Sequence, residues 1–296
     1  MRGLPAALLL AFLPLAAVSA SDKPLPPSAV VTSGPVALEL IDAATAGGKL
    51  ELARGLLERA KHAGQDGPAL DLRLADYWLA SGSTAQAAAA FEKLTGDPAT
   101  SAAAWQGVGL AALAGGDDQR AATAFGKAVA AAPQLSRAWA GLAVTADQRG
   151  DFAAAEAAYA RALALMPDNA TTLSNRGYSR ILQARYGEAV GDLTEALRLE
   201  PRLATAATNR RLALSMAGNY GAAFAGADKH QIARDLNTVG FGAMMRGDYA
   251  AAEGYFTRAI QTNPEFDRTA WRNLTYLKTI APRPEDPAAA SLARRN

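Results

Sequence analysis

The stretch RGDFAAAEAAYARALALMPDN, Arg149–Asn169, returns ninety-seven residues later as RGDYAAAEGYFTRAIQTNPEF, Arg246–Phe266. Both copies carry a glycine, an acid and an aromatic residue, then a run rich in alanine, and a proline near the end. Three prolines, Pro133, Pro167 and Pro201, recur at a spacing of thirty-four residues. Self-similarity at a fixed period indicates a chain built from repeats.

Small and bulky residues fall at fixed positions when each repeat is counted from Ala102, Ser136 and Ala170. Position 8 carries Gly109, Ala143 and Gly177, position 20 carries Ala121, Ala155 and Ala189, and position 27 carries Ala128, Ala162 and Ala196. Position 24 carries Phe125, Tyr159 and Leu193. Small residues facing large ones let two helices pack closely, and the proline at position 32 ends the second helix.

Glycine at position 15 predicts the turn between the two helices. It occurs as Gly48, Gly82, Gly116, Gly150, Gly218 and Gly247, and only Ala184 departs. Glycine is the usual left-handed residue after a helix. The next residue is Ser83, Asp117, Asp151, Asn219 or Asp248, each with a side chain suited to cap the second helix.

This pattern resembles the tetratricopeptide repeat. The resemblance implies an all-α solenoid, a right-handed superhelix of stacked antiparallel helix pairs. We expect about seven pairs over residues 34–266, the first degenerate and the sixth shortened near Gly226–Gln231. Residues 267–280 have helical spacing and predict a capping helix over the last apolar face.

The chain ends have other compositions. Residues 1–20 hold one early arginine, an apolar run and a small-residue cleavage pattern, which predicts a signal peptide rather than a membrane anchor, because the run is short and holds two prolines. We expect a proline-rich linker over 21–33 and a disordered tail over 281–296. Export from a bacterial cytoplasm would bring the mature chain to the periplasm, with no membrane span after cleavage. The absence of cysteine excludes a lipid-modified N-terminal cysteine.

Composition and motifs argue against several classes of function. Thirty basic and twenty-eight acidic residues give a formal charge of +2, which argues against nucleic acid as a partner. Without cysteine there is no thiolate metal site, and His62 and His230 stand far apart. No phosphate loop or nucleophile elbow occurs. We therefore predict no active site, no metal and no cofactor, and for an enzyme subunit the candidate carboxylates are Asp147, Asp192 and Glu195.

The tetratricopeptide resemblance implies that partners bind first-helix positions 2, 5, 6, 9 and 12. The candidate groove residues are Arg137, Ser174, Asn175, Tyr178, Thr208, Asn209, Asn237 and Phe241. Asn175 and Asn209 share a position in successive repeats, so their amides either hold the backbone of an extended peptide or merely solvate a face. The lysine–asparagine set that clamps a C-terminal carboxylate is not reproduced, which disfavours chaperone tails.

Several arginines break the pattern. Arg176 and Arg210 stand at position 7, where an apolar residue is expected, and Arg211 stands at position 8. With Arg180 and Arg185 they predict a basic patch for an acidic partner, a loosened repeat, or a slip in the register of the repeats.

A narrower resemblance rests on NRGYSRILQARYGEAVGDLTEALRLEP, a curtailed repeat, and DLNTVGFGAMMRGDYAAAEGYFTRAIQTNP. These segments, residues 175–201 and 235–264, resemble the TadD family of Flp-type pilus assembly. The resemblance implies a cell-envelope adaptor that supports a secretin and pilus-assembly partners. A general periplasmic scaffold for cell-wall or export enzymes stays an alternative, and an enzyme subunit a remote one.

Overall fold

The structure is a computed structural model that describes residues 35–225, 231–262 and 268–281. Within these ranges the chain forms fifteen helices and no strand. It divides into two compact units, Met1–Asn175 and Arg176–Asn296. The first unit contains α2 (Leu38–Ala46), α3 (Leu50–His62), α4 (Pro68–Ala80), α5 (Thr84–Leu94), α6 (Ser101–Ala114), α7 (Asp118–Ala131), α8 (Ser136–Gln148) and α9 (Phe152–Leu165).

The boundary between the units falls inside α10 (Ala170–Leu182). The second unit continues with α11 (Tyr186–Leu199), α12 (Ala204–Met216), α13 (Tyr220–Ala223), α14 (Ile232–Arg246), α15 (Tyr249–Thr262) and α16 (Arg268–Ile280). An all-α fold of stacked helix pairs is therefore confirmed.

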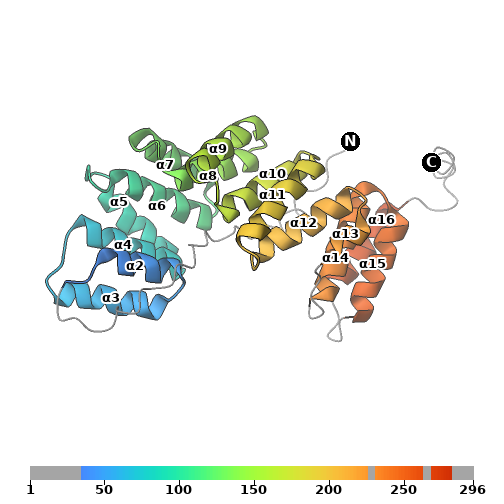
Figure 1. Ribbon diagram of the computed structural model, residues 1–296, viewed down its shortest axis with the longest axis horizontal. Helices are drawn as coiled ribbons and strands as arrows, with labels where there is room; N and C mark the ends of the chain where they lie inside the picture. Colours follow the sequence, from blue (N-terminus) through green and yellow to red (C-terminus); the bar gives the residue numbers. More distant parts are fainter. Residues whose placement is uncertain (1–34, 226–230, 263–267, 282–296) are drawn as a thin grey trace. The chain divides into compact units, whose positions relative to one another are not determined.

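The helices of the first unit pack as consecutive pairs, α2 with α3, α4 with α5, α6 with α7 and α8 with α9 (Figure 1). The first members also contact one another in the order α2, α4, α6 and α8, and we call them the first-helix layer. The second helices α3, α5 and α7 each touch the first helix of the following pair. Two successive pairs therefore share one continuous core.

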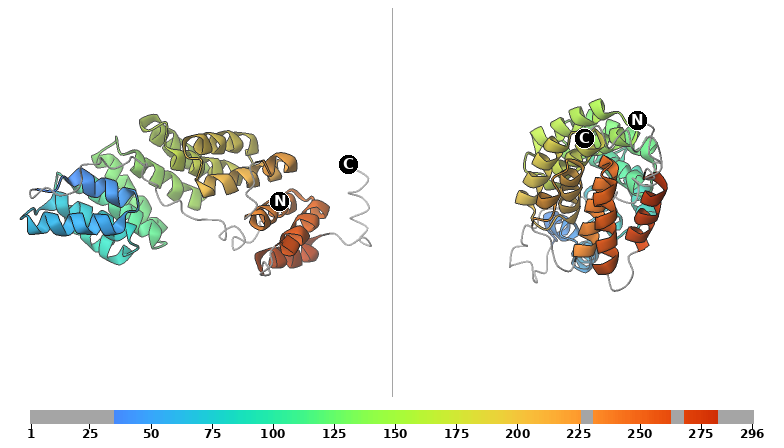
Figure 2. Two further views of the ribbon diagram at one scale, coloured as in Figure 1. Left: turned by 60° about the horizontal axis from the view of Figure 1, so that its bottom comes forward. Right: turned by 90° about the vertical axis from the view of Figure 1, so that its right-hand side faces the viewer.

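The second unit repeats this arrangement with one short element. Helix α12 packs against α11 and α14, and α15 packs against α14 and α16 (Figure 2). The four-residue helix α13 stands where the sixth repeat needs its second helix, and residues 226–230 lie outside the described residues. Helix α16 occupies the predicted capping segment and contacts α14 and α15.

The turn predicted at position 15 is confirmed in all seven repeats. The six glycines have φ between 66° and 87°, and Ala184 has φ 59°, the only non-glycine residue with positive φ in the described structure. At Gly116 the amide donates to the carbonyl of Leu113 at 3.1 Å, and the amide of Asp117 donates to that of Ala112 at 2.9 Å. These two bonds satisfy the last carbonyls of α6 and reverse the chain.

The residue after the turn behaves as predicted in three cases. The side chains of Asp117, Asp151 and Asp248 each accept a hydrogen bond from the amide three residues on, at 3.0 to 3.1 Å. The prediction is wrong for Ser83 and Asn219, which make no side-chain cap. The Ser83 hydroxyl instead accepts a bond from Ser81, and nothing in the structure explains Asn219.

The core is built from bulky residues seated against glycine. The Phe125 ring is fully buried, and a Cβ atom added at Gly109 or Gly141 would lie 2.6 or 2.4 Å from it. Gly109 belongs to the same repeat as Phe125 and Gly141 to the next one. The alanines at positions 20 and 27 are also buried, with no exposed surface at Ala121, Ala128, Ala155, Ala162, Ala189 or Ala196.

Among the described helices, none is both long and apolar enough to cross a membrane. The predicted signal peptide over 1–20 and linker over 21–33 lie outside the described residues, as does the predicted tail apart from Ala281.

Exchanging glycine and alanine at the turn tests its left-handed geometry. We expect Gly116→Ala to lower the free energy of unfolding by about 1 kcal/mol and Ala184→Gly to raise it by a similar amount, because a Cβ atom disfavours this conformation. Gly126→Ala is the control, since Gly126 lies inside α7 with open space around it and alanine favours the helix. Urea unfolding measures all three, and a destabilising Ala184→Gly would contradict a strained left-handed alanine.

Candidate functional site

The eight predicted groove residues divide between the two units. Arg137, Ser174 and Asn175 belong to the first, and Tyr178, Thr208, Asn209, Asn237 and Phe241 to the second. Ser174 is buried, whereas Arg137, Asn175, Tyr178, Thr208 and Asn209 are partly exposed.

Two of the predicted groove residues are packed inside the second unit. Asn237 is 4% exposed, and its side-chain oxygen accepts a hydrogen bond of 2.9 Å from the amide of Asn273 on α16. Phe241 is 3% exposed. The capping helix therefore contacts α14 at the position where the sequence predicts a partner, and a ligand could reach these two side chains only if packing changed.

A cluster of charged and amide side chains lies on the first-helix layer. It comprises Asp42 on α2, Arg73 and Asp76 on α4, Gln106 on α6 and Arg137 on α8, and we call it the first-helix cluster. All five side chains are partly buried. Sequence reasoning identified only Arg137 among them as a candidate. The same repeat positions could have identified the others in the three upstream repeats. Asp42 and Asp76 stand at position 9, Arg73 at position 6 and Gln106 at position 5.

One edge of the first-helix cluster is closed by an ion pair. Nη2 of Arg73 lies 2.9 Å from a carboxylate oxygen of Asp42, and Nη1 donates to the carbonyl of Ala69 at 3.1 Å. The pair links α4 to α2.

The other part of the cluster is open. Arg137 and Asp76 interact electrostatically across α6, yet no hydrogen bond or ion pair joins them in the described structure. Nε of Arg137 and Oε1 of Gln106 are buried without a hydrogen-bond partner. Unpaired buried polar groups are costly, so such a set calls for an explanation.

Burial also shifts the pKa values of Asp76 and Arg137. It raises the pKa of Asp76 from 3.8 to about 6, with Arg137 acting to lower it and Asp42 to raise it. Burial lowers the pKa of Arg137, and Asp76 opposes that change. A perturbed carboxyl beside unpartnered polar groups is typical of functional sites.

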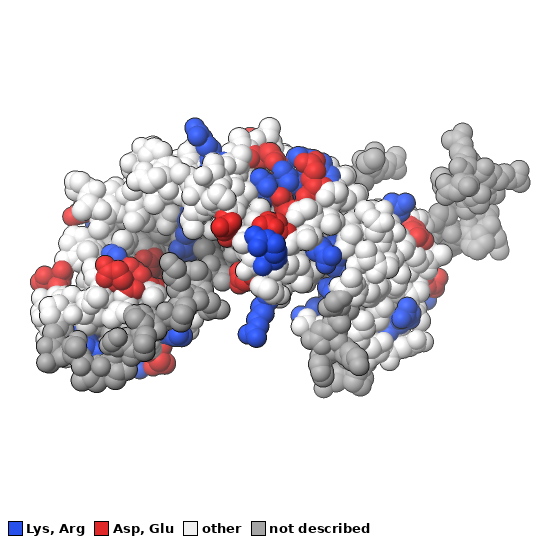
Figure 3. Space-filling model, in the orientation of Figure 1, with Lys and Arg blue, Asp and Glu red and all other residues white. Residues whose placement is uncertain are grey.

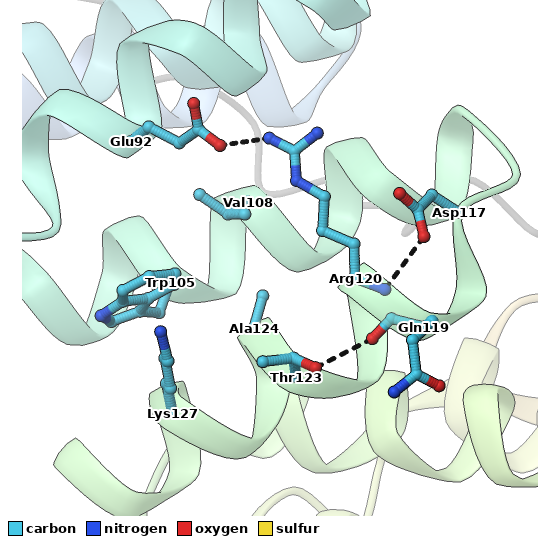
Figure 4. Close-up of a pocket in the computed structure, with 9 residues that line it drawn as sticks. All are labelled: Glu92, Trp105, Val108, Asp117, Gln119, Arg120, Thr123, Ala124 and Lys127. Carbon is cyan, nitrogen blue, oxygen red and sulfur yellow. Dashed lines mark hydrogen bonds and ion pairs between the residues drawn. The ribbon is translucent and has the colours of Figure 1, made fainter.

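A surface recess of about 440 Å³ lies elsewhere in the first unit, between α5, α6 and α7 (Figure 4). Its charges already have partners. Arg120 is paired with Glu92, and the Lys127 ammonium lies 3.9 Å from the centre of the Trp105 ring. Asp117 caps α7 through the amide of Arg120. The recess therefore lies between three helices, and the charged side chains named above already have partners.

The unusual arginines of the second unit are mostly accounted for by internal ion pairs. Asp192 on α11 is 7% exposed and accepts two bonds from Arg176, at 2.9 and 2.7 Å, and one from Arg180 at 2.7 Å. Arg185 pairs with Glu188. Figure 3 shows positive and negative side chains side by side over α10 and α11. Arg176, Arg180 and Arg185 are therefore paired with acidic side chains of their own unit rather than left as a basic patch, and the loosened repeat and the slip in register stay predictions.

Arg211 also has an internal ion pair. Its guanidinium lies 2.9 Å from the buried carboxylate of Asp235 on α14, and its Nε donates to the carbonyl of Ala223 at 3.0 Å. These contacts tie α12 to α14 and to the short helix α13. Nothing in the structure explains Arg210, whose buried Nε lacks a hydrogen bond.

The carboxylates considered for an enzyme have structural partners. Asp147 accepts a hydrogen bond of 2.9 Å from the Tyr159 hydroxyl, Asp192 holds two arginines, and Glu195 pairs with Arg198. His62 is exposed, and His230 lies outside the described residues. Within the part of the chain that the structure describes, no group of His, Asp and Glu has the arrangement of a metal site.

Comparison with known proteins agrees with this architecture. Models of the tetratricopeptide repeat match residues 72–136 and 136–169. No curated protein matches the chain. The chain therefore carries tetratricopeptide repeats over residues 72–169, and repeats of this class indicate a protein-interaction scaffold.

Solved structures share the fold. One chain of the Cut9–Hcn1 hetero-tetramer of the APC/C matches with a TM-score of 0.61 at 18% identity. The match covers 80% of this chain and 48% of that chain, so this chain spans about half of the length of that structure's chain. A thermophilic TPR protein of Thermus thermophilus matches with a TM-score of 0.52 at 23% identity, over 60% and 96%. A tetratricopeptide repeat protein of Parabacteroides merdae matches with a TM-score of 0.51 at 15% identity, over 81% and 97%.

Removing the charge of Asp76 tests its environment. We expect Asp76→Asn to raise the free energy of unfolding at pH 7 by at most about 3 kcal/mol, the cost that corresponds to a pKa raised from 3.8 to about 6. This cost is present above pH 6 and disappears as the pH falls below 3.8, where the carboxyl is protonated in both states. Urea unfolding at pH 4 and pH 7 measures it, with exposed Asp71→Asn as the control. An effect of Asp76→Asn that is equal at both pH values would refute the assignment.

Removing Asp192 tests the internal ion pairs. We expect Asp192→Ala to lower the free energy of unfolding by about 3 kcal/mol, because Arg176 and Arg180 would stay partly buried without their carboxylate. Glu195→Ala, on the same helix and in an exposed pair, is the control with little change. A stable Asp192→Ala variant would mean that the network contributes nothing to folding.

Proposed function

We propose that this chain is a non-catalytic adaptor of the bacterial cell envelope that serves Flp-type pilus assembly and binds protein partners on its first helices. The general role of an interaction scaffold follows from the repeats. The pilus role rests on the resemblance of residues 175–201 and 235–264 to the TadD family, and the periplasmic location on the signal-like residues 1–20.

The first-helix cluster is the observation that carries the proposed binding surface. Its Asp76 is held partly buried at a cost to stability, and neither Gln106 nor Arg137 has all of its buried polar atoms satisfied. Side chains kept in such surroundings are explained by a ligand that supplies the missing contacts. Asn175, Thr208 and Asn209 are partly exposed at comparable repeat positions and extend the candidate surface within their own units.

Affinity capture from cross-linked native envelopes tests the proposal. We expect the tagged chain to bring down a secretin and pilus-assembly proteins, and expect Arg137→Ala and the double variant Asn175→Ala with Asn209→Ala to lose most of them. Arg149→Ala, at the exposed C-terminal end of α8, is the matched control.

The outcomes separate the candidate functions. Recovery of cell-wall or export enzymes in place of pilus proteins would replace the pilus role with a general periplasmic scaffold. Recovery of partners that is indifferent to all three substitutions would move the binding surface away from the first helices. A chain found only in the cytoplasmic fraction would overturn the proposed location.

A further inference from the structure

The side chains at positions 7 and 23 of a repeat lie together where its two helices pack. In the fifth repeat they are Arg176 and Asp192, joined by hydrogen bonds of 2.9 and 2.7 Å. In the third, fourth and seventh repeats each pair belongs to one hydrophobic cluster, as Val108 with Ala124, Leu142 with Ala158 and Val239 with Tyr255. An arginine at position 7 therefore requires an acid at position 23.

The sixth repeat has the arginine without the acid. Its position 7 is Arg210 and its position 23 is Gly226, and its second helix, α13, ends at Ala223. The buried Nε of Arg210 has no hydrogen-bond partner, and no ion pair reaches its guanidinium among the described residues. A partly buried charge without a partner is costly, so its presence calls for an explanation.

Arg211, the next residue, has both of the contacts that Arg210 lacks. Its guanidinium lies 2.9 Å from a carboxylate oxygen of Asp235, and its Nε donates to the carbonyl of Ala223 at 3.0 Å. In a helix that continued, this carbonyl would accept from the amide four residues on. Arg211 therefore closes the end of the short helix, whereas Arg210 beside it is left without an acid.

We propose that Arg210 pairs with a carboxylate of a partner protein, whose acidic helix docks beside the truncated end of α13 and takes the place that Asp192 has in the fifth repeat. This surface belongs to the second unit, whereas the first-helix cluster belongs to the first, so it is a second binding surface. The inference rests on the proposed adaptor role only for the existence of a protein partner.

The fifth repeat indicates the chemistry that the partner needs. The planar guanidinium of an arginine matches a carboxylate with two parallel hydrogen bonds, as Asp192 receives from Arg176. Leu193, the next residue of α11, lies against Gly177, where an added Cβ atom would be 2.7 Å from its Cγ. The sixth repeat has Arg211 in place of that glycine, so the docking helix needs a small residue after its acid.

Peptides taken from α11 test the inference on the purified full chain. The parent probe is residues 190–200 with Leu193→Ala, end-blocked and fluorescently labelled, which starts at position 21, just after the positions that α13 supplies. Two further probes add Asp192→Asn or Glu195→Gln, and each loses one negative charge. Fluorescence anisotropy gives the dissociation constants. The protein variants are Arg210→Gln and, as control, Arg202→Gln in the exposed turn before α12.

We expect the parent probe to bind, Asp192→Asn to weaken binding about tenfold, and Glu195→Gln to change it little, because only position 23 meets Arg210. Arg210→Gln weakens binding of the parent probe to the same extent, and Arg202→Gln does not. Combining Arg210→Gln with the Asp192→Asn probe costs no more than either change alone, as two groups in one contact require.

Urea unfolding gives a second measurement that needs no ligand. We expect Arg210→Leu to raise the unfolding midpoint of the full chain, because leucine suits position 7, as at Leu142, and the unpaired polar group is removed. A lower midpoint would mean that Arg210 already has a partner within the chain, and the inference would then be wrong.

Two results of the peptide experiment also overturn the inference. One is no binding of the parent probe at about 1 mM. The other is equal weakening by Asp192→Asn and Glu195→Gln, which would show attraction by net charge alone. If envelope capture still depends on Arg137 in either case, the adaptor role stands and only the second binding surface fails.

Discussion

The close contact between a bulky residue of one second helix and glycines of two first helices is the constraint on which this structure depends. The Phe125 ring fills the space above Gly109 of its own repeat and Gly141 of the next. One side chain therefore holds a helix pair together and also joins it to its neighbour. A chain stabilised in this way has a core only where repeats are stacked, which explains why the same pattern recurs along the sequence.

This packing decides which surface is left for a partner. Positions 8, 20, 24 and 27 are occupied by helix contacts, whereas Asp42, Arg73, Asp76, Gln106 and Arg137 on the first helices stay partly exposed. There the chain places Asp76, Gln106 and Arg137 without direct partners. In the second unit three arginines have internal ion pairs. Arg176 and Arg180 pair with Asp192, and Arg211 pairs with Asp235. These three arginines of the second unit are therefore paired, whereas Arg137 of the first unit has no direct ion pair within the described residues.

Sequence reasoning succeeded where structure is set locally. At position 15 the amide donates to the carbonyl three residues earlier, and the next amide donates to the carbonyl five residues before it, so the turn is set locally. The pattern alone therefore located all seven turns, including the one at the left-handed Ala184. It failed for Arg176, because the carboxylate that pairs with it is sixteen residues away on another helix. It also missed Asp76 and Gln106, since each is ordinary alone and the cluster exists only once α4, α6 and α8 are side by side.

Site-specific photo-cross-linking in native envelopes tests most directly whether the first-helix layer receives the partner. A benzophenone amino acid at Gln106 on α6 is compared with one at the exposed Ala130 on α7, the second helix of the same pair. We predict partner adducts from the position on α6 and none from that on α7. Adducts from α7 alone would contradict binding at the first helices, because the partner would then occupy the opposite side of the helix pair.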